Sequence, residues 1–121
     1  PAPIVSDKKL YSIAYGNNKF IAVGESGTVI ISDNGSVWDT RNSNNSSGNL
    51  YSIAFGNSRF VGVGYNTVIV STDNGTNFLQ TATSYDFNDI SFGNGIFVAV
   101  GDDENIHTST DGNDWTKVHG K

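Results

Sequence analysis

The stretch L-Y-S-I-A-Y-G-N-N-K-F-I-A-V-G at residues 10–24 returns at residues 50–64 as L-Y-S-I-A-F-G-N-S-R-F-V-G-V-G. A third copy, D-I-S-F-G-N-G-I-F-V-A-V-G, covers residues 89–101. The first two copies start 40 positions apart, at Leu10 and Leu50. A period of this length predicts a repeat architecture, in which each unit buries its apolar face against a neighbouring unit.

Each repeat predicts four short strands joined by tight turns. In the first copy we expect strands at residues 11–15, 20–23 and 28–32, with a fourth that starts at Trp38. Gly and Asn fill the junctions, and both residues adopt positive φ in tight hairpins. The second strand of each copy is apolar throughout, which is typical of a strand buried on both faces. Four-stranded units of about 40 residues are typical of β-propeller blades.

A short acidic phrase that contains glycine follows the third strand of every copy. It reads S-D-N-G-S-V-W at residues 32–38, S-T-D-N-G-T-N-F at 71–78 and S-T-D-G-N-D-W at 109–115. The phrase resembles the Asp box of BNR repeats in sialidases and related propellers. The G-N-x-x-F-x-x-V-G phrase before it resembles repeats of bacterial surface proteins and phage tail proteins. The resemblance covers residues 10–118 and implies a propeller.

We interpret the box as a structural turn. Its Asp carboxylate is expected to accept backbone N–H bonds, its Gly to supply permissive backbone, and its aromatic residue to pack against the blade. Ile31 takes the place of Ser71, so we expect the first copy to lack the hydroxyl of the box. The predicted structural residues are Asp33, Gly35, Trp38, Asp73, Gly75, Phe78, Asp111, Gly112 and Trp115.

Catalysis is not expected. A sialidase site, as the resemblance implies, needs three arginines, and the chain has Arg41 and Arg59 only. The chain has no Cys, which excludes disulfides and thiol chemistry. Asp102, Asp103 and Glu104 are weak Ca²⁺ candidates, because consecutive acids lack the alternating spacing of a ligand loop. We therefore predict a protein that is not an enzyme and needs no cofactor or metal; a fragment of a glycoside hydrolase is the weakest alternative.

The charge balance limits the classes of partner. Twelve acidic and seven basic residues give a net charge of −5, which argues against nucleic acid and anionic lipid as partners. No apolar run approaches the roughly 20 residues of a membrane-spanning helix. The resemblance favours an extracellular, cell-surface or phage-associated protein, which fits secretion.

Comparison of the copies points to one edge of the sheets. In a four-stranded meander the glycine turns and the boxes share an edge, and these segments are nearly identical in all copies. The loops at the other edge diverge, and binding residues favour such loops. The candidate ligand-binding residues there are Arg41, Tyr65, Asn66, Tyr85 and Asn88. We predict lectin-like recognition of a carbohydrate or cell-surface ligand; the alternative is a structural or protein-interaction scaffold without a small ligand.

Three blades cannot close a propeller ring, which usually has 4–8 blades. We predict an all-β protein with blades at residues 10–49, 50–86 and 87–121 in one domain. Two copies would close a six-bladed ring as a homodimer. Residues 1–9 contain a short β-like run at residues 3–6, which is expected to complete a terminal or partner blade.

Overall fold

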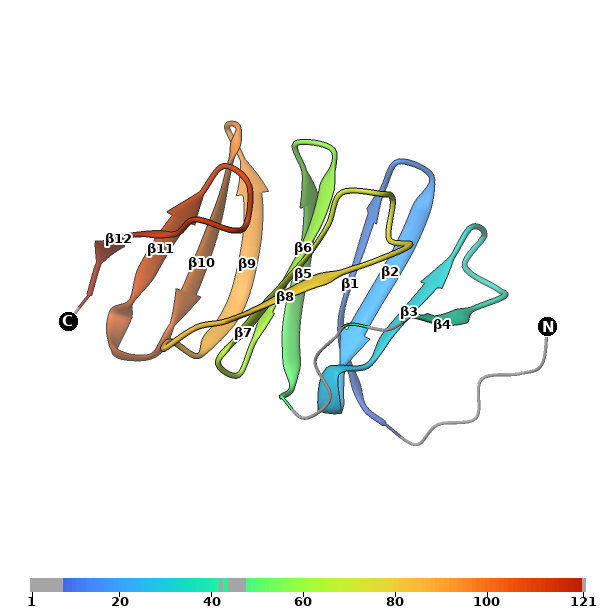
Figure 1. Ribbon diagram of the computed structural model, residues 1–121, viewed down its shortest axis with the longest axis horizontal. Coiled ribbons are helices and arrows are strands. Elements are labelled where there is room, and N and C mark those ends of the chain that lie inside the picture. Colours follow the sequence, from blue (N-terminus) through green and yellow to red (C-terminus); the bar gives the residue numbers. More distant parts are fainter. Residues whose placement is uncertain (1–7, 42, 44–47, 121) are drawn as a thin grey trace.

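The computed structural model describes residues 8–41, 43 and 48–120 and contains three four-stranded antiparallel sheets, each a meander in chain order (Figure 1). The run at residues 3–6 lies outside the described residues. Sheet 1 holds β1 (Leu10–Gly16), β2 (Lys19–Gly24), β3 (Val29–Ser32) and β4 (Asp39–Arg41). Sheet 2 holds β5 (Leu50–Gly56), β6 (Arg59–Gly64), β7 (Thr67–Ser71) and β8 (Leu79–Ala82). Sheet 3 holds β9 (Phe87–Gly93), β10 (Ile96–Gly101), β11 (Ile106–Ser109) and β12 (Thr116–His119).

The first turn of each sheet explains why β1, β5 and β9 fold back on their neighbours. Asn17 and Asn18 both have positive φ, at 49° and 65°, and the equivalent positions in the other sheets do so as well. Two successive positive φ values form the hairpin turn whose twist matches that of the strands. The repeated G-N-x phrase therefore encodes three similar hairpins.

The hydrophobic core lies between the sheets. Ile21, Val23 and Val29 of sheet 1 belong to one buried cluster with Leu50 and Ile53 of sheet 2. A second cluster joins the opposite face of sheet 2 to sheet 3; it holds Val61, Val63, Val68 and Val70 with Phe87, Ile90, Phe97 and Ala99. The sheets stand side by side in chain order, with sheets 1 and 3 at the two ends (Figure 1). Sheet 2 is therefore covered on both faces, which its apolar β6 predicted.

Successive sheets are linked by a phenylalanine ring that packs on a glycine of the preceding sheet, Phe55 of β5 on Gly16 of β1 and Phe92 of β9 on Gly56 of β5. A Cβ atom added at Gly16 would overlap the Phe55 ring, and one added at Gly56 would overlap the Phe92 ring. Each ring also packs on a phenylalanine of its own sheet, Phe55 on Phe60 and Phe92 on Phe97. Glycine is thus required at Gly16 and Gly56 because a side chain there would occupy the space of the ring.

Short 3₁₀ turns at Glu25–Gly27 and Asp102–Glu104 join the second and third strands of sheets 1 and 3. Across residues 8–41, 43 and 48–120, no helix is long and apolar enough to cross a membrane.

Two glycines of sheet 3, Gly112 in the box turn and Gly95 in the hairpin between β9 and β10, give a test of the packing between sheets. A Cβ at Gly112 would lie 2.6 Å from Val61 Cγ2 and 3.0 Å from Val70 Cγ2 of sheet 2, whereas one at Gly95 would meet nothing within 4 Å. Both glycines have positive φ, at 82° and 79°, so alanine costs similar backbone strain at each. We expect Gly112→Ala to lower the free energy of unfolding by about 1–3 kcal/mol more than Gly95→Ala. Equal losses in urea titrations would contradict this packing.

Candidate functional site

The box turns of sheets 2 and 3 use their carboxylates internally. The backbone N–H of Asn77 donates to Asp73 Oδ1 at 2.9 Å, and those of Asp114 and Asn113 donate to Asp111 Oδ1 at 3.0 and 2.9 Å. These bonds stabilise the charged form, so the pKa values of Asp73 and Asp111 lie below their ordinary value. Each carboxylate is thereby committed to its own turn.

Hydroxyl and aromatic residues complete these two turns. Ser71 Oγ accepts the N–H of Gly75 at 2.8 Å, and Ser109 Oγ accepts the N–H of Gly112 at 2.7 Å. The Trp115 indole donates to the carbonyl of Gly112 at 2.8 Å, while Phe78 is buried. The carboxylates and serine hydroxyls of these two turns are therefore bonded within their own turns.

The box of sheet 1 differs from the sequence expectation. Asn34 Oδ1, not Asp33, accepts the turn's backbone N–H bonds, from Ser36 at 2.9 Å and Val37 at 3.0 Å. Ser32 Oγ accepts the N–H of Gly35 at 2.8 Å, so the hydroxyl expected to be missing at Ile31 is supplied one position later. The reason is register, because the acceptor stands two residues after the serine in every box, and that position holds Asn34, Asp73 and Asp111.

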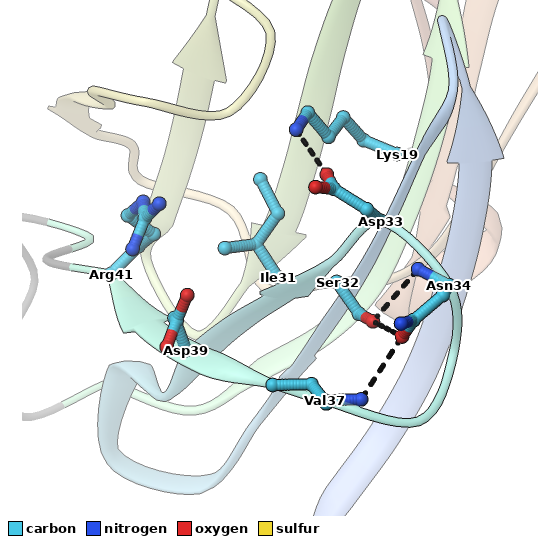
Figure 2. A pocket seen from close by; sticks show the side chains of 8 residues that line it. All are labelled: Lys19, Ile31, Ser32, Asp33, Asn34, Val37, Asp39 and Arg41. Carbon is cyan, nitrogen blue, oxygen red and sulfur yellow. Dashed lines mark hydrogen bonds and ion pairs between the residues drawn. The ribbon is translucent and has the colours of Figure 1, made fainter. Parts of the chain in front are cut away.

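This shift releases Asp33 into a cavity of about 290 Å³ (Figure 2). Its side chain is 74% exposed and forms an ion pair with Lys19 Nζ. Asp39 and Arg41 reach the same cavity from β4, over a floor that includes Ile31. Two cationic side chains, Lys19 and Arg41, and two acidic ones, Asp33 and Asp39, therefore line this cavity. The backbone of Arg41 pairs with Val29, which follows the variable loop of sheet 1, while its side chain lines this cavity.

The other four predicted ligand-binding residues lie at the edge of the sheets opposite the box turns, which we call the variable edge. It holds the loops that join the second and third strands of each sheet and the connection from β8 to β9, and hydrogen bonds link these loops. The backbone N–H of Asn66 donates to Asp86 Oδ1 at 3.1 Å, and its carbonyl accepts the N–H of Thr83 at 3.0 Å. Asn88 Nδ2 donates to Asp102 Oδ1 at 3.3 Å. Tyr65 projects from this edge as an exposed ring.

Tyr85 belongs to a group of four rings between sheets 2 and 3. Its ring centroid lies 4.3 Å from that of His107, and Phe87 connects His107 to Trp115 at 5.1 and 5.5 Å. The rings line a cavity of about 350 Å³ together with hydroxyl, amide and amino groups. Sequence reasoning did not place His107 or Trp115 in a binding site; the available signal was that His107 takes a slot that the other copies fill with isoleucine.

Burial lowers the pKa of His107, and the charge of Lys117 lowers it further. The ring is buried in the core between the sheets, and its Nδ1 has no hydrogen-bond partner among the described residues. Burial therefore favours the neutral imidazole, which packs against the Tyr85 and Phe87 rings.

The acidic turn at Asp102–Glu104 makes local contacts. Asp102 accepts the amide of Asn88 as described above, and Glu104 Oε1 lies 3.2 Å from His119 Nε2. Among the residues that the structure describes, no three acidic or histidine side chains are grouped as metal ligands.

No family model matches the chain, and neither does any curated protein. Solved structures do match. "YCF48 from Cyanidioschyzon merolae" is similar with a TM-score of 0.82 and 18% identity over 98% of this chain and 42% of that one. "YCF48 bound to D1 peptide" gives 0.77 and 19% over 91% of this chain and 40% of that one. The WD40 β-propeller domain of Doa1 gives 0.68 and 16% over 88% and 38%.

These similarities show the fold. The three sheets have the architecture of β-propeller blades. The chain spans about two fifths of the length of each of these proteins. The likeness to Asp-box repeats stays a resemblance, because no family match supports it.

The corrected box of sheet 1 predicts different effects of two neighbouring substitutions. Asn34→Ala removes the acceptor of two backbone N–H bonds and should lower the free energy of unfolding by about 1–2 kcal/mol. Asp33→Ala removes an exposed ion pair and should change it by less than about 0.5 kcal/mol. Urea titration of both variants measures the difference, and a larger loss in Asp33→Ala would reverse the assignment.

His107 predicts a pH dependence of stability. Because its folded pKa lies below the ordinary value of 6.5, the unfolded chain binds this proton more readily. The stability contributed by the neutral ring is fully present above pH 6.5 and is lost as the pH falls toward the folded pKa. His107→Ile restores the residue of the other copies, so its advantage over the parent should grow between about pH 7.5 and pH 5. Parallel stability profiles would contradict this role.

Proposed function

We propose that the chain is a non-enzymatic protein-interaction scaffold of the β-propeller type, which binds its partner through the variable edge. The contrast between the two edges carries this proposal. The constant edge holds the hairpin turns at residues 17–18, 57–58 and 94–95 and the box turns at residues 32–38, 71–78 and 109–115. In each box turn a serine hydroxyl accepts a backbone N–H of the same turn. The variable edge holds different side chains in each sheet on a rigid support, which is the usual arrangement of binding loops.

The similar structures favour this function over carbohydrate recognition, the main prediction from the sequence. One of them contains a bound peptide, and another is a WD40 propeller domain. None of these three is described with a sugar. Exposed tyrosines such as Tyr65 and Tyr85 are also frequent anchors in protein interfaces, because they bury a large area at a low entropic cost.

A closed ring would make the variable edge a single rigid surface. Among the described residues, no further sheet covers the outer faces of sheets 1 and 3, and water-exposed apolar faces of this kind mark association sites. We propose that two copies close a ring of six blades, as the sequence suggested. The ring would carry two equal partner sites, so that a partner with two motifs would gain avidity.

Selection from a random-peptide phage library, beside a glycan array, tests the function. We expect peptide binders whose affinity falls at least about tenfold in Tyr65→Ala or Tyr85→Ala, as for interface anchors. Thr76→Ala is the matched control, because Thr76 is exposed on a box turn at the constant edge. Binding of sugars without peptides, or equal losses in the control, would overturn the proposal.

A further inference from the structure

The outer face of sheet 1 repeats a face that is buried elsewhere in the chain. Ile13 is 57% exposed, whereas its equivalents Ile53 and Ile90 are 4% and 6% exposed. Leu10 is exposed as well, although the equivalent Leu50 and Phe87 are buried. These residues line an open hollow of about 540 Å³, together with Tyr11, Ser12, Ala22, Ile30 and Trp38. Sheet 1 therefore has the surface that receives a preceding sheet, and none precedes it among the described residues.

The outer face of sheet 3 repeats the opposite surface. Val100 is 39% exposed, whereas its equivalents Val23 and Val63 are fully buried against the next sheet. Val98 and Ile106 are partly exposed, although Ile21, Val61, Val29 and Val68 in the same positions are buried. Side chains alternate along a strand, so these residues point away from sheet 2 while Phe97 and Ala99 pack against it. Sheet 3 has the surface that packs onto a following sheet.

The contact of an aromatic ring with a glycine is also left open at both ends. Tyr15 occupies the position of Phe55 and Phe92, and its ring packs on Phe20 at 4.6 Å, as theirs do on Phe60 and Phe97. Gly93 occupies the position of Gly16 and Gly56, yet a Cβ added there would meet nothing within 4 Å. Within residues 8–41, 43 and 48–120, the Tyr15 ring thus has no glycine to pack on, and Gly93 has no ring packed on it.

We infer that the outer face of sheet 3 packs onto the outer face of sheet 1 of a second copy, head to tail, in the manner of the internal sheet contacts. Tyr15 of one copy then sits on Gly93 of the other, and Ile13 joins Val98, Val100 and Ile106 in one apolar cluster. This inference rests on the proposed six-bladed ring and assigns its interfaces.

The occupant is argued to be a second copy because the chain itself shows the complementary pair twice. Sheet 1 meets sheet 2, and sheet 2 meets sheet 3, through the same two surfaces. A head-to-tail contact used twice under a two-fold axis closes on itself. Because every sheet keeps its direction around the ring, the variable edges of both copies lie on one face of it.

Light scattering of the 121-residue chain gives the first test. We expect twice the chain mass of 12.9 kDa. Gly93→Val fills the open seat without a clash inside the chain, so it should fold and weaken association at least about tenfold. Leu79→Lys, on an exposed residue of sheet 2 outside both end faces, should associate like the parent. A folded monomer of the parent chain, or larger open assemblies, would overturn the inference.

Charged variants test the direction of the contact. Ile13→Lys and Val100→Glu should each be monomeric alone, because each places a charge in both interfaces of its own dimer. Mixed together they should form a heterodimer, with one native interface and one that brings lysine and glutamate together. A dimer of either variant alone would show that like faces meet and would overturn the head-to-tail arrangement. Circular dichroism shows whether each variant is folded before its mass is interpreted.

The two proposals fail separately. A dimer with the expected variant pattern that selects no peptide keeps the interface and removes the binding function. Peptide binding by a chain that stays monomeric at micromolar concentration would keep the binding function and remove the interface.

Discussion

Packing between the apolar faces of successive sheets is the interaction on which the rest of this structure depends. A four-stranded sheet of this size has no second layer of its own, so its β-branched residues are buried only by the next sheet. Ile21 and Ile31 of sheet 1 show this directly, because they pack against sheet 2 and would meet a Cβ of Gly75 at 2.5 and 2.8 Å. Glycine at that point lets the box turn of one sheet approach the face of the sheet before it.

This constraint separates the two edges of the molecule. The constant edge has to fit the neighbouring sheet, and its hydrogen bonds reach across the sheets. Asn57 Nδ2 donates to the carbonyls of Gly95 and Thr110 at 3.1 and 2.9 Å, and Arg59 donates to the carbonyl of Asp111 at 3.0 Å. The variable edge also links successive sheets, because the N–H of Ser26 donates to Asn49 Oδ1 at 3.0 Å and the N–H of Asn66 donates to Asp86 Oδ1 at 3.1 Å. The side chains beyond these bonds nevertheless differ from copy to copy. The location of the proposed partner site follows from this division.

Much of the fold could be predicted from the sequence because the same pattern of turns and apolar strands occurs in each of three repeats. The three sheets and their strand order follow from that pattern. The exchange of Asp33 for Asn34 was missed because two acceptors stand side by side, and the turn uses the one that lies two residues after the serine hydroxyl. The sequence did not show that the side chain of Arg41 lines the cavity beside the box of sheet 1. The burial of His107 could be expected from the isoleucines at the same position of the other copies. The contact with Tyr85 could not, because Tyr85 lies in the loop before β9.

The central claim is that the surfaces which join the sheets inside the chain also join two chains. The most direct measurement uses thiol cross-linking, since the chain has no cysteine of its own. Tyr15→Cys and Gly93→Cys would bring their Cβ atoms within disulfide range in the proposed contact. The account predicts a disulfide-linked dimer when the two variants are mixed under mild oxidation, and none when either is oxidised alone. A linked dimer of Tyr15→Cys with itself, or no linkage in the mixture, would contradict it.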